Sequence, residues 1–151
     1  MHGLEDSLAT AFLDIVRFVT DPRRDWRMMA EAELDLDPAF LPVLVRLGTW
    51  GPAGVVELAG ELGRDHSTMS RQLTKLEAAE LIVRSPCETD GRVRTAQVTP
   101  RGAAAVAALS AARRRLLDEA VSEWSPRERQ ALVRLLGRFA GELTSPLKEA
   151  R

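Results

Sequence analysis

The sequence predicts a mainly α-helical fold with one short β-hairpin, and three observations lead to this prediction. Apolar residues recur at steps of three and four over most of the 151 residues, which is the periodicity of amphipathic helices. Residues 55–63 and 65–81 are two such stretches separated by a tight turn that contains a glycine, the arrangement of a helix-turn-helix. Two β-prone runs follow at once, so the hairpin forms a wing and the predicted architecture is a winged helix-turn-helix.

The N-terminal third is predicted to hold three helices. An apolar stripe runs over residues 4–20, until Asp-Pro at positions 21–22 interrupts it. Asp followed by Pro is also the pattern of an N-cap and a first-turn proline, so a second, short helix begins there. Asp-Pro at positions 37–38 repeats this start signal before a third apolar face, which we expect to end at Gly48.

The helix-turn-helix begins with residues 55–62, whose apolar face is followed by Gly63 as the C-terminal exit. Only one residue then separates this glycine from Asp65, which can cap the second helix. The apolar stripe of that second helix consists of Met69, Leu73 and Leu76.

The hairpin and the C-terminal helices follow from the remaining sequence. The β-prone runs LIVRS (81–85) and VRTAQV (93–98) flank the tip SPCETDGR (85–92), which contains the Pro, Asp and Gly typical of a turn. An alanine-rich helix is predicted over residues 99–122, and a capping box at 125–128 starts the last helix.

The composition fits one soluble domain, with 45% hydrophobic and 28% charged residues. The single cysteine, Cys87, cannot form an internal disulfide bond. No stretch approaches the roughly 18 apolar residues of a membrane helix, and the N-terminus lacks the pattern of a secretion signal. We therefore expect a cytoplasmic protein without membrane association.

The net charge of −1 hides a gradient along the chain. Residues 1–63 hold 5 basic and 11 acidic side chains, residues 64–101 hold 7 and 5, and residues 102–151 hold 9 and 6. Because salt screens charges beyond roughly 8 Å, local basic density matters more to a phosphate backbone than the total. The middle segment is therefore the candidate for binding a polyanion.

A helical wheel places five polar or basic side chains opposite the apolar stripe of the second helix: Ser67, Thr68, Arg71, Thr74 and Lys75. Such side chains suit the major groove of DNA. Arg71 could bind guanine O6 and N7, Ser67 and Thr68 could reach phosphates or base edges, and Lys75 could neutralise a phosphate. The alternative is an ordinary solvated helix face.

Two arginines lie at the hairpin. Arg92 is at or near its tip, beside Asp90 and Gly91, and Arg94 follows two residues later on the same face of a strand. Arginine suits a narrow minor groove because its guanidinium sheds water at low cost, and Asp90 could hold one arginine by a bidentate pair. The alternative is a hairpin whose alternating charges keep it soluble.

Four segments of the chain carry a resemblance to a known family: VVELAGELG, DHSTMSRQLTKLEAAELI, the wing and VTPRG. Through them, roughly residues 38–102 resemble the core of the MarR family of bacterial transcription regulators. The wing pattern Asp90-x-Arg92 is part of this resemblance. The resemblance implies that the helices at 4–20 and 126–147 build an obligate homodimer. It also implies that this dimer binds a palindrome in double-stranded DNA.

The family pattern also assigns roles to single residues. It implies that Asp90 orients an arginine while Arg92 enters the minor groove. The major-groove and phosphate contacts that it implies are those of Ser67, Thr68, Ser70 and Arg71.

This chain departs from the family pattern in three places. His66 stands where relatives often carry arginine, so a phosphate contact there is expected to be weaker or sensitive to pH. Glu80 stands where a glycine is usual before the first strand, so it must adopt a strained or altered turn. The segment 21–36 is longer and more acidic than is usual, which alters the expected effector pocket.

The effectors of the family tend to be small apolar or phenolic molecules bound between the dimer helices and the wing domain. Five apolar side chains could line such a cleft: Phe18, Trp26, Met28, Met29 and Trp50. The alternative is that they belong to the ordinary core.

Other chemistry finds little support in the sequence. Cys87 lies near the wing, where its thiol could sense oxidants, but most lone cysteines are inert. His2 and His66 are the two histidines and lie in unrelated segments, so we expect no metal site. No phosphate-binding loop and no nucleophile with a matched base is present, so we expect no cofactor and no enzyme activity.

These observations predict a ligand-responsive transcriptional repressor that binds a palindromic operator as a homodimer. The alternative is a degenerate winged helix that keeps the dimer helices but binds a protein instead of DNA. The predicted division of the chain is residues 1–36 for N-terminal dimer helices and a pocket wall, 37–101 for the DNA-binding core, and 102–151 for C-terminal dimer helices.

Overall fold

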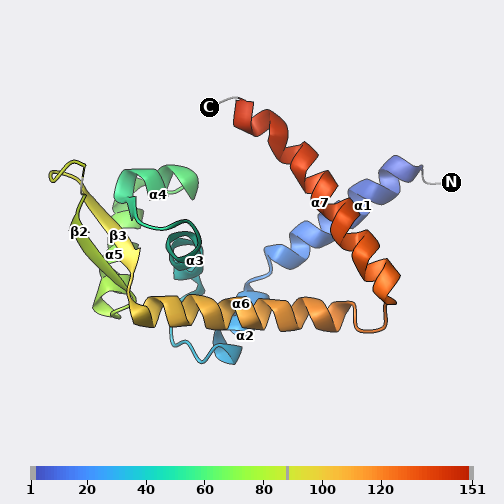
Figure 1. Cartoon of the computed structure of the whole chain (residues 1–151), viewed down its shortest axis with the longest axis horizontal. Helices are drawn as coiled ribbons and strands as arrows, with labels where there is room; N and C mark the ends of the chain where they lie inside the picture. The colour runs from blue at the N-terminus through green and yellow to red at the C-terminus, as the bar shows by residue number, and fades with distance from the viewer. Residues whose placement is uncertain (1–2, 88, 150–151) are drawn as a thin grey trace. The chain divides into compact units, whose positions relative to one another are not determined.

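Seven α-helices and a three-stranded antiparallel sheet form the part of the chain that the computed structural model describes, residues 3–87 and 89–149 (Figure 1). Two compact units share these residues, with their boundary between Arg113 and Arg114. The predicted mainly α-helical winged helix-turn-helix is confirmed. The elements are α1 (Leu4–Val19), α2 (Pro22–Glu31), α3 (Leu41–Trp50), β1 (Ala53–Gly54), α4 (Val55–Glu61), α5 (His66–Ala78), β2 (Ile82–Pro86), β3 (Arg94–Val98), α6 (Pro100–Ala120) and α7 (Pro126–Glu149).

The first helix begins and ends close to the predicted positions, and the second helix begins where the sequence predicts. Helix α1 is amphipathic, and its apolar side chains from Leu8 to Val19 are exposed. The Asp21 carboxylate accepts the backbone N–H of Arg23 at 2.9 Å, and Pro22 occupies the first turn of α2. The predicted start signal is therefore confirmed at this helix.

The predicted end of α3 at Gly48 is wrong. A short 3₁₀ turn (Pro38–Phe40) leads into α3, which continues to Trp50 and ends at Gly51 with φ 87°. A Cβ atom at Gly48 would lie 2.7 Å from a methyl group of Val106. This glycine therefore permits α3 to pack closely against α6, and the stop is made by the next glycine along the chain.

The helix-turn-helix consists of α4 and α5, and Gly63 adopts φ 61° in the turn between them. The Asp65 side chain caps α5, and the predicted stripe of Met69, Leu73 and Leu76 is buried in the core. Helices α2, α3 and α6 and the sheet complete this core. Its most deeply buried large side chains are Met29, Val43, Leu44, Leu47, Leu58, Met69, Leu76, Ile82 and Leu109.

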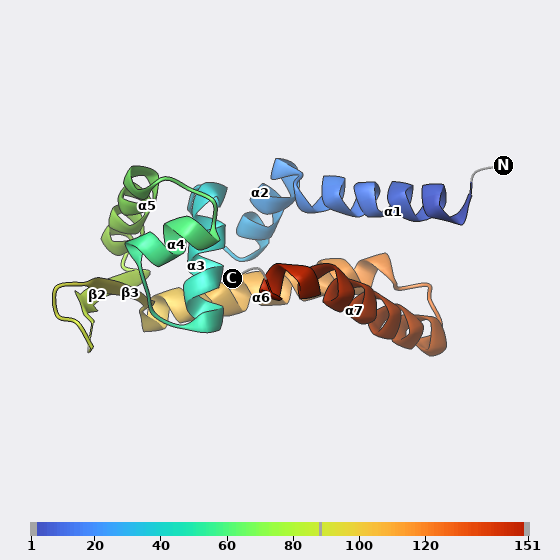
Figure 2. The same cartoon turned by 90° about the horizontal axis from the view of Figure 1, so that it is seen from above.

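The sheet has the strand order β1-β3-β2. Strands β2 and β3 pair from Ile82 opposite Val98 to Pro86 opposite Arg94, within one residue of the predicted runs. The two-residue strand β1, which the sequence did not predict, pairs with the other edge of β3. Figures 1 and 2 show this hairpin beside α4 and α5, with its loop projecting away from the helices.

Helix α6 starts where the hairpin ends. The Thr99 hydroxyl accepts the backbone N–H of Gly102 at 3.0 Å, and the Thr99 N–H donates to the Leu81 carbonyl at 3.0 Å. A Cβ atom at Gly102 would lie 1.9 Å from that same carbonyl oxygen. The threonine and the glycine of the VTPRG motif are thus required by the close approach of α6 to the start of β2.

The second unit contains the end of α6 and all of α7. The predicted capping box is confirmed, because Glu128 accepts the N–H and hydroxyl of Ser125 while the Ser125 hydroxyl accepts the N–H of Glu128. Several apolar side chains of α7 are exposed. Along the described residues, no helix combines the length and apolar character that a membrane crossing requires.

Candidate nucleic-acid interface

The outward face of α5 carries the residues that the helical wheel selected. Ser67, Arg71, Thr74 and Lys75 are exposed, and Thr68 is half-buried. Ser70, which the wheel placed at the edge of this face, is also half-buried. The structure therefore confirms the exposure of this polar face, opposite the buried apolar stripe.

Asp65 organises the start of this face. Its carboxylate accepts the Thr68 backbone N–H at 2.8 Å, the Ser67 hydroxyl at 2.6 Å and the Thr68 hydroxyl at 2.6 Å. These hydrogen bonds, with that of Ser67 the largest cause, hold the pKa of Asp65 well below its usual range. One Arg71 N–H donates to the Thr68 hydroxyl oxygen at 3.3 Å, so the guanidinium lies next to the network.

The later turns of α5 are tied to their neighbours. The Lys75 ammonium lies 5.8 Å from the centre of the Phe40 ring, a cation–π contact between α5 and the 3₁₀ turn. The Thr74 hydroxyl donates to the Ser70 carbonyl at 3.0 Å. Of the predicted contacts, Ser67 thus lies in the first turn of the helix, Arg71 in the second and Lys75 in the third.

The loop of the hairpin is closed by hydrogen bonds from backbone N–H groups. The Cys87 N–H donates to the Val93 carbonyl at 2.7 Å, and the Asp90 carboxylate accepts the backbone N–H of Arg92 at 3.0 Å. Asp90 therefore shapes the turn through the backbone of Arg92. Among the described side chains, none pairs with the Arg92 guanidinium, which is exposed.

Arg94 joins the two strands of the wing, and Arg84 joins the wing to α5. Arg94 donates to the Arg84 carbonyl at 3.0 Å, so its side chain crosses to the neighbouring strand. Arg84 itself donates to the Glu77 carboxylate at 2.8 Å, which joins β2 to α5. This ion pair lowers the pKa of Glu77, with the Arg84 hydrogen bond as the main cause. The wing and the recognition helix are therefore linked by a direct, half-buried contact.

The expected strained turn at Glu80 is confirmed. Glu80 has φ 60°, and the adjacent Leu81 N–H donates back to the Leu76 carbonyl at 3.0 Å. A residue other than glycine is uncommon in this left-handed conformation. The Glu80 carbonyl accepts the Thr99 hydroxyl at 2.7 Å, and its carboxylate pairs with Arg101 at 3.1 Å.

Sequence reasoning did not select Arg46, a buried arginine in α3. Its guanidinium pairs with Glu57 and Glu61 of α4, donates to the Gly51 carbonyl, and lies 5.7 Å from the centre of the Trp50 ring. An arginine inside an apolar stripe, followed by two glutamates four residues apart, is the signal that could have revealed it. The Glu77–Arg84 pair has no such signal, because neither residue interrupts an apolar stripe and the contact depends on how β2 returns alongside α5.

Cys87 lies at the base of the loop and is half-buried. Its sulfur is 3.2 Å from the Thr89 hydroxyl, and this hydrogen bond is the main cause of a lowered thiol pKa. His66 is exposed in the first turn of α5, whereas His2 lies outside the described residues. Within the described part of the chain, no group of three metal-ligating side chains converges.

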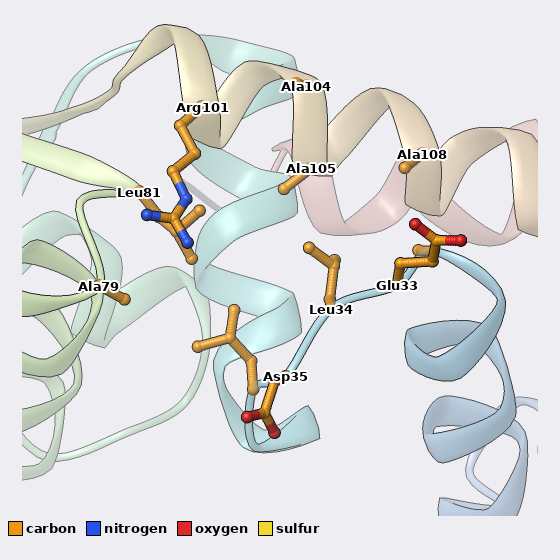
Figure 3. Close-up of a pocket in the computed structure, with 11 residues that line it drawn as sticks. Glu33, Leu34, Asp35, Ala79, Leu81, Arg101, Ala104, Ala105 and Ala108 are labelled. Carbon is orange, nitrogen blue, oxygen red and sulfur yellow. The ribbon is translucent and has the colours of Figure 1, made fainter.

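A pocket of about 400 Å³ lies in the first unit, between the linker that joins α2 to α3, the end of α5 and the start of α6. Figure 3 shows Arg101 extending from α6 toward Leu81, with Glu33 and Asp35 on the linker. None of the five predicted cleft side chains is among its lining residues. Met28 and Met29 are buried, and Trp26, Trp50 and Phe18 are exposed. The pocket wall consists of Ala32, Glu33, Leu34, Asp35, Leu36, Ala79, Leu81, Arg101, Ala104, Ala105 and Ala108.

Comparison with known proteins agrees with this architecture. Residues 38–93 match the profile of the MarR family. The chain is 38% identical to the HTH-type transcriptional regulator YxaD of Bacillus subtilis over 105 residues, which cover 70% of this chain and 73% of that protein. These relatives are transcriptional regulators, in agreement with the prediction that the chain is not an enzyme.

Solved structures share the fold along almost the whole chain. RV1404 from Mycobacterium tuberculosis is 29% identical with a TM-score of 0.77, and covers 93% of this chain and 94% of its own. A MarR family protein from Bacillus stearothermophilus is 19% identical with a TM-score of 0.81, over 95% of this chain and 100% of its own. The exposed polar face of α5, the wing joined to it and these similarities all point to a winged-helix regulator. The chain belongs to the MarR family of DNA-binding helix-turn-helix transcriptional regulators.

Proposed function

We propose that this regulator reads operator DNA with α5 in the major groove and the loop of the wing in the flanking minor groove. The carrying observation is that Arg71 and Arg92 are both exposed, on two elements that the Glu77–Arg84 pair fixes to each other. In this arrangement Arg71 binds a guanine edge, and Arg92 enters the minor groove. The other proposed contact or supporting residues are Ser67, Thr68, Ser70, Lys75, Asp90 and Arg94.

We also propose that the regulator acts as a homodimer on a palindromic operator. Helix α1 exposes Leu8 by 53% and Ile15 by 50%, and α7 exposes Leu136 by 46% and Leu143 by 49%, each pair seven residues apart on one face. Exposed apolar stripes of this kind are typical of subunit interfaces. Two-fold symmetry then requires two half-sites, with centres about 10 bp apart for neighbouring major grooves on one face.

The response that we propose is repression relieved by a small apolar or phenolic ligand. The pocket beside α6 has a suitable volume, since small-molecule sites measure about 300–1,000 Å³. Its wall combines apolar surface, from the alanines of α6 and the leucines of the linker, with the charged side chains Glu33, Asp35 and Arg101. Release of an operator duplex on titration with phenol or 4-hydroxybenzoate tests this response.

Selection of bound fragments from random duplex DNA, followed by a salt titration, tests DNA binding itself. We expect an enriched palindrome and a steep loss of affinity with salt, with a log–log slope of about −0.9 per neutralised phosphate. A flat salt profile with no enriched sequence would instead support a module that binds proteins.

Alanine variants test the assignment of the two arginines. We expect Arg71→Ala to lose about 1–3 kcal/mol of operator binding and to relax the preference at one base pair. Arg92→Ala is expected to weaken binding and to reduce the preference for a narrow minor groove. Arg127→Ala, which removes an exposed arginine from α7, is the charge-matched control. Equal binding by all four proteins would refute the assignment.

A further inference from the structure

We propose that Asp65 fixes Ser67 as a hydrogen-bond acceptor toward DNA, so that Ser67 selects a base with an exposed amino group. This inference rests on the proposed function, because it requires α5 to lie in the major groove. It goes further by naming which base edges this side chain can bind. It also assigns Asp65 the part of a specificity-determining residue that need not touch DNA.

The argument starts from the chemistry of the carboxylate. An ionised carboxylate has no hydrogen to donate, so the 2.6 Å contacts to Ser67 and Thr68 must use the hydrogens of the two hydroxyls. The depressed pKa of Asp65 means that this carboxylate is ionised at neutral pH. Hydrogen bonds to a charged acceptor are roughly twice as strong as neutral ones, so these directions are well fixed.

The two hydroxyls differ in what remains available to DNA. Thr68 donates to Asp65 and accepts from Arg71 at 3.3 Å, so its hydroxyl serves mainly to hold the arginine. Ser67 also donates to Asp65, but it is exposed and its hydroxyl oxygen still has two lone pairs that can accept hydrogen bonds. Ser67 can therefore accept a hydrogen bond from DNA without giving up the contact with Asp65.

The major groove offers few donors to such a group. Guanine presents O6 and N7, thymine presents O4, and phosphates present only oxygens, none of which carries a hydrogen. The amino groups of cytosine N4 and adenine N6 are the donors on the base edges. Turning the Ser67 hydroxyl toward a phosphate would also bring that anion close to the Asp65 carboxylate, and like charges repel. The geometry therefore favours cytosine or adenine opposite Ser67.

Two substitutions of Asp65 separate two effects on DNA binding: losing the acceptor that orients the Ser67 hydroxyl, and losing the negative charge. In Asp65→Asn, the amide oxygen can still accept from the Thr68 N–H and the Ser67 hydroxyl, which share one carboxylate oxygen. In Asp65→Ser, the shorter side chain can still cap the helix, because serine is a favoured N-cap, but no carboxylate remains for Ser67. Both variants remove the same negative charge.

The test uses the full-length chain and operator duplexes that differ at one base pair per half-site, after selection has defined the operator. The base pair that Ser67 contacts is the one at which Ser67→Ala no longer distinguishes between bases. We expect the wild type and Asp65→Asn to prefer cytosine or adenine there by about threefold to tenfold, as a net hydrogen bond supplies. Asp65→Ser should lose this preference, and should change nothing further when combined with Ser67→Ala.

Several results would overturn the inference. If Ser67→Ala weakens all sequences equally, Ser67 contacts the phosphate backbone and not a base, and the inference fails while the proposed function stands; the salt slope should then be unchanged, because a neutral hydroxyl neutralises no phosphate charge. If Asp65→Ser is folded, as judged by circular dichroism, and keeps the wild-type base preference, then Asp65 does not set the preference of Ser67. Should Asp65→Ser not fold, the Ser67→Ala result still decides whether the serine is an acceptor. Failure of the wild type to enrich any sequence would refute the proposed function itself.

Discussion

Replacement of Gly102 by alanine tests the junction between the wing and α6. A Cβ atom at this position would lie 1.9 Å from the Leu81 carbonyl oxygen, 2.9 Å from its carbonyl carbon and 3.3 Å from Cβ of Val98. Ordinary van der Waals contact begins at 3.4 Å, so the helix or the strand must move by about 1.5 Å. The nearest atoms belong to the backbone at the start of β2, which cannot rotate away as a side chain could.

Two opposing terms decide the size of the effect. Alanine in a helix is more stable than glycine by about 0.5–1 kcal/mol. Overpacking of a well-packed site costs about 1–3 kcal/mol, and the required shift also disturbs the hydrogen bond from the Gly102 N–H to the Thr99 hydroxyl. The clash is therefore expected to exceed the gain in helix propensity, with a net loss of about 1–2 kcal/mol in the free energy of unfolding.

Urea and thermal unfolding at one fixed protein concentration measure this loss. A loss of about 1–2 kcal/mol corresponds to a fall in Tm of about 2–8 °C for a chain of this size. Gly60→Ala is the control, because Gly60 is exposed in α4 with open space around its Cβ position, and it should gain about 0.5–1 kcal/mol. Equal stability of Gly102→Ala and the wild type would refute the reasoning.

Two further predictions concern the turn and the ion pair next to this junction. Glu80→Gly should raise the free energy of unfolding by up to about 1 kcal/mol in urea unfolding, because it relieves a left-handed conformation that costs about 1–2 kcal/mol and loses only an exposed pair with Arg101. Ala78→Gly, at the last helical residue of α5, should lower the free energy of unfolding. A loss of stability in both variants would contradict the strain at Glu80. Glu77→Gln should cost about 0.5–1 kcal/mol at pH 7. Because the folded-state pKa of Glu77 is lowered, its contribution is complete above the ordinary glutamate pKa and disappears as the pH falls below about 4, so the two stability curves should converge there; a gap independent of pH would contradict the ion pair with Arg84.

Much of the fold could be predicted because its signals are local. Asp-Pro pairs at 21–22 and 37–38 mark helix starts, since an aspartate cap and a first-turn proline act within one turn. The end of α3 could not be read correctly, because two glycines lie three residues apart and only tertiary contact decides their roles. Gly48 faces Val106, and Gly51 takes the positive φ that ends the helix.

The candidate site divides in the same way between local and tertiary information. The polar face of α5 follows from helical periodicity, so the exposure of Arg71 was predictable. The contact between Glu77 and Arg84 depends on how β2 returns alongside α5, which no spacing rule gives. The direction of the Ser67 hydroxyl needed coordinates as well, because a cap residue can bind the backbone alone or, like Asp65, side chains too.

The backbone of Leu81 connects α5, β2 and α6, which the proposed function requires to act together. The Leu81 N–H bonds to the carbonyl near the end of α5, its carbonyl oxygen accepts from Thr99 at the start of α6, and the next residue begins β2. Leu81 and Arg101 also line the pocket beside α6. A ligand can shift the regulator only if it binds one arrangement better than another. In the proposed response, a ligand in this pocket that met this condition would act at the junction between the wing and α5, and would not need to reach the side chains that we propose contact DNA.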